Sequence, residues 1–216
     1  RIDTHTNLFR NLADLNTDGT RIVHSNLRIH PFDSEFQSFD GTGITLIDAL
    51  TGTTQSILET TNTVSGQVRF SPDGRWLLMT GLNGTRLWDM VQGDESVALS
   101  RDASSSSAAF SLDSHFLAFS DLLGSTGQLV IYDVLKPEQI YFGEIPGAEI
   151  NSGSYIFELA WSPDGSTIAV PLNSLVDDRQ YTLHLFDVES QRFTLMAEAD
   201  DYLYDLTYSP DGSLLA

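Results

Sequence analysis

A short turn motif that recurs along the chain constrains the fold more than any other feature. An aromatic residue is followed by Ser-Pro-Asp-Gly and a short apolar run in copies that begin at Phe70, Trp161 and Tyr208. Two relaxed copies begin at Phe110 and Leu15. Self-similarity at a spacing of about 40 to 55 residues is typical of architectures in which one supersecondary unit is repeated. We therefore expect the chain to consist of copies of one unit.

Each residue of the motif has a role in a tight turn. Proline fixes φ, aspartate accepts hydrogen bonds from nearby backbone N–H groups, and glycine adopts a positive φ at no steric cost. The apolar runs that follow are short, which is typical of strands buried on both faces and not of helices. These runs are Trp76–Met79, Phe116–Phe119 and Ile168–Val170. The motif therefore predicts a β-hairpin.

A second motif alternates with the first and predicts another hairpin in the same unit. It is an apolar pair followed by aspartate, and strand-like segments come after it. The four copies end at Asp48, Asp89, Asp133 and Asp187. Each unit then contains four strands, A to D. A four-stranded unit with this period predicts an all-β fold, a β-propeller built of four-stranded antiparallel blades.

The two motifs divide residues 1–216 into blades of a single propeller segment. We expect about four complete blades, and the approximate repeats are 14–58, 66–99, 107–142, 156–196 and a partial repeat at 203–216. The partial repeat predicts that the sequence is truncated from a longer array. The alternative is that the N-terminal strands complete the last blade and close a ring of about five blades. The N-terminal piece is short for that purpose, which favours the truncated array.

The turn motifs and the strand-C endings resemble the WD-repeat family over roughly residues 14–216. The endings are Trp88-Asp89, Tyr132-Asp133 and Phe186-Asp187. The family's Gly-His pair before strand A is missing in every copy, and with it the histidine of the family's buried Asp-His-Ser/Thr-Trp network. Ser-Pro-Asp-Gly turns also occur in related propellers, including the one attached to prolyl-oligopeptidase-type serine peptidases.

The WD-repeat resemblance implies a non-catalytic scaffold that binds a protein or peptide partner. The main alternative is the propeller domain of a larger prolyl-oligopeptidase-type serine hydrolase, with its catalytic domain outside this sequence. A third possibility is a small-molecule hydrolase or sugar-binding propeller that uses the central channel. Fold alone does not decide between these functions.

The charge of the chain excludes two classes of partner. There are 30 acidic and 11 basic residues, which gives a net charge of −19. Nucleic acids and anionic membrane surfaces also carry negative charge, so we expect neither as a partner.

No stretch approaches the roughly 18 consecutive apolar residues of a membrane-spanning helix. Cysteine is absent, which excludes disulfides and thiolate metal sites. The cellular compartment stays open.

The lengths of the connections indicate where a partner would bind. The alternating strands place the A–B and C–D turns at one end of each blade and the B–C and D–A loops at the other. The turns are short, whereas long loops are expected at residues 24–43, 143–155 and 173–180. Variable loops on a rigid framework are where recognition resides. The candidate binding residues are Phe32, Phe36, Phe39 and Tyr155, although these aromatic side chains would equally pin their own loops to the blades.

The sequence offers no catalytic constellation. It lacks a Gly-x-Ser-x-Gly elbow, and its five histidines are scattered. We expect His184 on a strand face and His115 facing solvent. Residues 14–19 resemble the first half of a calcium loop, but positions 9 and 12 of that loop are Ile22 and Ser25. A turn is therefore favoured, and we expect no catalytic residue, metal site or cofactor.

Overall fold

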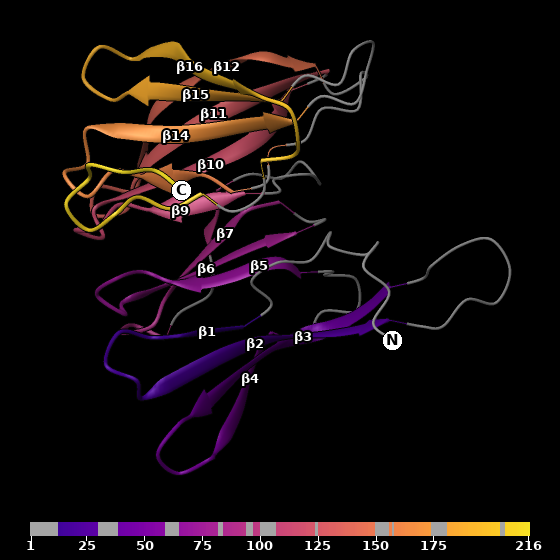
Figure 1. Ribbon diagram of the computed structural model, residues 1–216. Coiled ribbons are helices and arrows are strands. Elements are labelled where there is room, and N and C mark those ends of the chain that lie inside the picture. The colour runs from indigo at the N-terminus through magenta and orange to yellow at the C-terminus, as the bar shows by residue number, and fades with distance from the viewer. Residues whose placement is uncertain are drawn as a thin grey trace, which may run out of the picture. The chain divides into compact units, whose positions relative to one another are not determined.

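A computed structural model confirms the predicted all-β fold. It describes residues 13–29, 39–58, 65–81, 84–93, 97–99, 107–123, 125–149, 156, 158–173, 181–203 and 206–216. These residues contain no helix and form four antiparallel sheets of four strands each (Figure 1). In every sheet the four strands pair in chain order. Each sheet is therefore one propeller blade.

The chain divides into two compact units, residues 1–104 and 105–216, and each unit contains two of the blades. The first blade consists of β1 (Ala13–Leu15), β2 (Arg21–Ile29), β3 (Phe39–Asp48) and β4 (Thr54–Leu58). The second consists of β5 (Ser65–Phe70), β6 (Trp76–Gly81), β7 (Arg86–Asp89) and β8 (Val97–Ala98).

The second unit has the same composition and an additional C-terminal segment. Its first blade, the third of the chain, consists of β9 (Ala108–Phe110), β10 (Phe116–Leu123), β11 (Thr126–Asp133) and β12 (Glu138–Glu149). The fourth blade consists of β13 (Ala160–Trp161), β14 (Thr167–Asn173), β15 (Tyr181–Asp187) and β16 (Arg192–Ala199). After β16, Tyr208 and Leu215 form an antiparallel bridge around a further Ser-Pro-Asp-Gly turn.

A serine hydroxyl organises the turn between the first two strands of a blade. In the second blade, Ser71 Oγ donates to Asp73 Oδ1 at 2.5 Å and accepts from the backbone N–H of Trp76 at 2.9 Å. Ser111, Ser162 and Ser209 make the same pair of bonds. In the first blade Asn16 Oδ1 accepts the equivalent N–H from Arg21, so the relaxed copy keeps the acceptor.

The aspartate that ends the third strand caps the second turn. Asp89 Oδ1 accepts from the backbone N–H groups of Val91 and Gln92, and Asp48 and Asp133 make the equivalent bonds. The residue after the aspartate is hydrogen-bonded to the first turn: Met90 N–H donates to the carbonyl of Arg75 at 2.7 Å. The two turns of a blade are therefore hydrogen-bonded to each other.

Apolar side chains and a carboxylate join the blades of the first unit. Val23 and Ile44 of the first blade pack with Val68, Phe70 and Leu77 of the second. Asp14 Oδ2 accepts from the backbone N–H of Phe70 at 2.7 Å, so β1 and β5 are tied side by side at this point. The neighbouring turns also meet, since Thr17 Oγ1 donates to the carbonyl of Pro72.

The second unit has the larger core, and a tryptophan links its blades. Leu129, Ile131 and Ile145 of the third blade pack with Ile168 and Phe186 of the fourth. Trp161, the aromatic residue that begins the turn motif, donates from Nε1 to the carbonyl of Ala109 at 2.9 Å. The aromatic position of the motif therefore connects one blade to the blade before it, in addition to filling the core.

The C-terminal segment is fixed to β14 by a buried amide. Asn173 Oδ1 accepts from the backbone N–H of Leu203 at 2.8 Å, and Asn173 Nδ2 donates to the Leu203 carbonyl at 2.9 Å. The Asn173 side chain is fully buried. Leu206, Tyr208 and Leu215 pack against Ala169 and its neighbours in the same apolar cluster. The amide thus takes the place of a backbone partner.

Two of the predicted long loops are shorter than expected, because strands extend into them. β2 and β3 continue as a pair, with Arg28 opposite Asp40, so the loop predicted at 24–43 begins later and ends earlier than expected. Residues 143–149 belong to β12, because Ile145 and Ala148 are buried in the core of the second unit. The burial of these two side chains in the core therefore extends β12, and with it the sheet, beyond the length that the sequence predicted.

The turn glycine provides a first test of the local structure. Gly165 has φ +72°, and a Cβ added there would meet nothing within 4 Å. We expect Gly165→Ala to lower the free energy of unfolding by about 1 kcal/mol, because only the left-handed backbone penalises the methyl group. Gly165→Asn should lower it less, since asparagine tolerates this conformation. Urea denaturation of both variants measures the difference, and equal losses would contradict this explanation.

The Asn173 amide provides a second test. Asn173→Ala leaves the N–H and the carbonyl of Leu203 without their partner, so we expect the free energy of unfolding to fall by about 2 kcal/mol or more. Amide exchange at Leu203 should accelerate. Glu198→Gln changes an exposed residue of β16, two strands away in the same blade, and serves as the control. Unchanged exchange at Leu203 in the alanine variant would show that the amide does not hold the segment.

Candidate interaction surface

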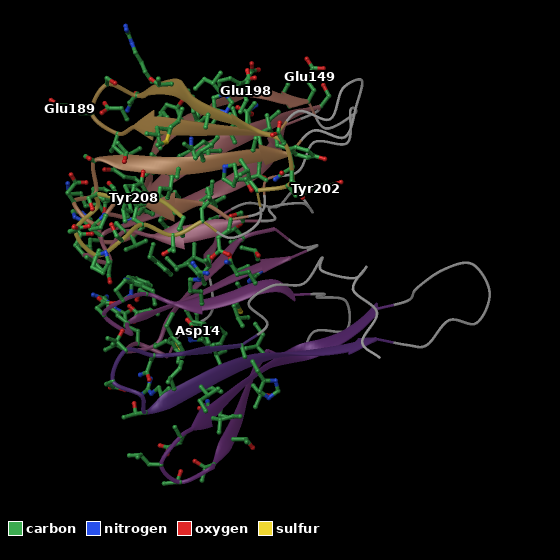
Figure 2. The ribbon with its side chains drawn as sticks, viewed as in Figure 1. Asp14, Glu149, Glu189, Glu198, Tyr202 and Tyr208 are labelled. Carbon is green, nitrogen blue, oxygen red and sulfur yellow. The ribbon has the colours of Figure 1, made fainter. Side chains whose placement is uncertain are left out.

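The two kinds of hairpin turn lie at the same end of each blade, which we call the turn edge. It comprises the first turns at 16–20, 71–75, 111–115, 162–166 and 209–213, and the second turns at 48–53, 89–93, 133–137 and 187–191. In the second unit, Figure 2 shows Glu189 and Tyr208 toward this edge and Glu149 and Tyr202 at the opposite end. The topology thus separates the turns from the loops, as the sequence predicts.

Turn aspartates on this edge are ionised and engaged by their own turns. Hydrogen bonds from Ser162 and Ser166 lower the pKa of Asp164 to about 2. Ser209 and Ser213 do the same for Asp211, whose pKa is also about 2. Hydrogen bonds likewise lower the pKa values of Asp18, Asp48 and Asp187. These carboxylates therefore stabilise turns and do not exchange protons near neutral pH.

Two cationic side chains pair with the strand-ending aspartates. Arg75 Nη2 lies 2.9 Å from Asp89 Oδ2, and its guanidinium lies 4.7 Å from the centre of the Trp76 ring. His115 Nε2 lies 3.3 Å from Asp133 Oδ2. These contacts connect the beginning of strand B to the end of strand C within one blade.

His115 is half-buried, whereas the sequence predicted that it faces solvent. Its ring stacks on Phe116, with the ring centres 4.2 Å apart. Its partner Asp133 is buried, and burial acts to raise the pKa of that carboxyl. The backbone N–H groups of Lys136 and Leu135, together with His115, outweigh this effect and hold the pKa below its usual value. The nearby Ser111 hydroxyl donates to Asp113, so it is engaged in the turn and is not activated by His115.

His184 lies on β15, as predicted, and is a core residue. It is 8% exposed and lies across from Val170 on one side and Leu195 on the other. Burial lowers the pKa of the imidazole, and Nδ1 has no hydrogen-bond partner. A neutral imidazole among aliphatic side chains fills the core and has no carboxylate to orient it for catalysis.

The calcium-like segment forms the first turn of the first blade. Asp14 accepts from the backbone N–H groups of Leu15 and Phe70, Asn16 accepts from Arg21, and Asp18 accepts from Thr20. The three side chains therefore serve different backbone donors. Within the described residues, no three His, Asp or Glu side chains gather where they could hold a metal ion.

The candidate aromatic residues of the loop end stay predictions. Phe32, Phe36 and Tyr155 lie outside the described residues. Phe39 is the first residue of β3 and pairs with Ile29, but its side chain lies outside the described part.

The structure adds one feature that the sequence did not predict: aliphatic side chains are exposed on the second turns. They are Leu50, Val91 and Leu135, and the signal that could have found them is their position two residues after the capping aspartate.

Comparisons with known proteins support the fold and no finer assignment. No family model matches the chain, so the WD-repeat resemblance stays a prediction. No curated protein matches it either. Among the described residues, no helix has the length and apolar character needed to cross a membrane.

Solved structures of similar fold include two enzymes and TolB. Hydrazine synthase from Kuenenia stuttgartiensis is 15% identical with a TM-score of 0.67, over 100% of this chain and 58% of that one. Porphyromonas gingivalis dipeptidyl peptidase 4 is 15% identical with a TM-score of 0.64, over 93% and 35%. TolB from Acinetobacter baumannii is 19% identical with a TM-score of 0.58, over 93% and 46%.

This chain is a set of β-propeller blades. It spans between 35% and 58% of the length of these three chains. TM-scores of 0.58 to 0.67 show a common fold, whereas identities of 15 to 19% leave the function to the residues of this chain.

The engaged aspartates predict a specific loss of stability in acid. A carboxyl whose pKa is lowered by folding contributes stability above its unfolded value of 3.8, and this contribution is lost as the pH falls toward about 2. The double variant Asp164→Asn, Asp211→Asn should therefore lose less stability between pH 4 and pH 2 than the wild type. Denaturant unfolding of the two proteins across this range measures it, with Glu189→Gln as a control for the removal of charge. Equal losses would contradict the assignment.

Proposed function

We propose that the chain is a non-catalytic propeller platform that binds a protein or peptide partner at the loop end of its blades. The observation that carries the proposal is the contrast between the two ends. At the turn edge, the same hydrogen bonds recur from blade to blade. The loops at the other end differ in length, and variable segments on a repeated framework are suited to recognition.

The chemistry of the described residues supports a binding role. His184 is buried without a partner for Nδ1, and the carboxylate beside His115 is held by backbone N–H groups. His115 contacts Asp133 and Phe116, and His184 lies between Val170 and Leu195, so neither has the hydroxyl partner that nucleophilic catalysis requires. A net charge of −19 favours a partner whose contacting segment is basic.

The proposal is tested by selecting peptides from a displayed library on the purified chain and locating their site. We expect Phe32→Ser and Phe36→Ser to weaken the selected peptide by about tenfold or more, since aromatic anchors dominate such interfaces. Leu112→Ser is the matched control, because Leu112 is 64% exposed on the turn edge. Equal weakening by the control, or binding unaffected by both phenylalanine variants, would contradict a site at the loop end.

The structural similarity to dipeptidyl peptidase 4 favours a second function. This chain matches only 35% of the length of that peptidase. In this alternative the blades are the propeller of a prolyl-oligopeptidase-type hydrolase. Sequencing of the coding region on both sides separates the two functions. An adjoining α/β domain with a Gly-x-Ser-x-Gly elbow would establish the hydrolase alternative, whereas further repeats with no other domain would support the platform.

A further inference from the structure

Exposed aliphatic side chains recur at one position of the turn edge. In the second turn of a blade, the residue two places after the capping aspartate is Leu50, Val91 and Leu135 in the first three blades. These side chains are 81%, 76% and 54% exposed. The fourth blade has Glu189 at the same position. Isolated exposed aliphatic residues are common on proteins, but recurrence at one structural position is not explained by chance exposure.

The fold does not require an aliphatic side chain at this position. The turn is held by the aspartate carboxylate and by backbone bonds, such as Asp48 Oδ1 with the N–H groups of Leu50 and Thr51. In the other three blades the residue that fills the core is the preceding one, since Val134 is buried and Met90 and Val188 pack against the apolar clusters. Because Glu189 occupies the same turn in the fourth blade, a charged residue is compatible with this backbone.

In the first unit, the two tips lie among carboxylates. Asp18, Asp48, Asp73 and Asp89 lie on its turns, where the cationic residues are Arg21 and Arg75. Arg75 is already bound to Asp89. The first turns of the two blades touch through Thr17 and Pro72, so Leu50 and Val91 stand at the same end of adjacent blades. An occupant of this edge must therefore bring apolar groups together with positive charge.

We infer that the turn edge is a docking surface for a basic, amphipathic segment of a partner protein, with Leu50 and Val91 as its apolar contacts. The charge selects this occupant. A second copy of the chain would add a net charge of −19 to the same surface, and an anionic membrane would be repelled in the same way. A basic segment would be attracted by the aspartates and would cover the two aliphatic side chains. This surface is at the opposite end of the blades from the proposed loop site and stands independently of it.

The test uses two synthetic peptides, one amphipathic peptide of leucine and lysine and one in which serine replaces every leucine. Fluorescence anisotropy with the whole chain gives their dissociation constants. We expect the leucine–lysine peptide to bind in a salt-sensitive manner and the serine–lysine peptide to bind at least about tenfold more weakly. The double variant Leu50→Ser, Val91→Ser should weaken the first peptide by about tenfold or more without any change in charge.

Two further variants control for misfolding and for nonspecific hydrophobic binding. Leu195→Ser removes an aliphatic side chain that is 50% exposed on β16, away from the turns, and should leave binding unchanged. Leu50→Glu copies the residue of the fourth blade, so it should fold, and it should still weaken binding although it adds negative charge. Unchanged binding in the double variant overturns the inference.

Two other occupants are separated by additional measurements on the same proteins. Sedimentation with vesicles of phosphatidylserine and phosphatidylcholine detects binding to an anionic membrane. Sedimentation velocity detects self-association. If either association occurs and is abolished by Leu50→Ser, Val91→Ser, the surface serves that occupant and the inference of a basic protein segment is wrong.

Discussion

The hydrogen bonds of one serine hydroxyl set the geometry on which each repeated blade depends. The hydroxyl donates to the turn aspartate and accepts the N–H of the residue five places ahead, as Ser71 does with Asp73 and Trp76. This closes the hairpin in one register, so the following strand presents the correct side chains to the neighbouring blades. The first blade lacks the serine, yet Asn16 Oδ1 accepts the equivalent bond. The acceptor is therefore the part of the motif that is retained.

This use of aspartate gives part of the acidic composition a structural role. Turn carboxylates such as Asp164 and Asp211 accept hydrogen bonds from serine hydroxyls and backbone N–H groups, and their pKa values fall to about 2. Each repeat therefore adds negative charge at the turn edge as a by-product of making its hairpins. A surface that is acidic for structural reasons also attracts basic partners, so folding and recognition draw on the same residues.

The two ends of a blade have different capacities for function. The turn edge repeats one backbone geometry, and its exposed positions vary from blade to blade, as Leu50, Val91 and Glu189 show. The loop end varies in length, which allows both shape and chemistry to change. Partner binding at the loop end and docking on the turn edge are therefore compatible in one molecule, since neither needs residues of the other.

The sequence by itself determined the turns, the four-stranded repeat and the all-β fold, because these depend on hydrogen bonds between residues only two to five positions apart, such as Ser162 with Thr167. Tertiary structure decided the rest. The extension of β12 through Ile145, the amide of Asn173 that holds Leu203, and the burial of Asp133 beside His115 all join residues that are distant in the chain. The exposure of Leu50 is of the same kind. No local pattern specifies such contacts, since burial is set by what packs against a residue and not by its neighbours in sequence.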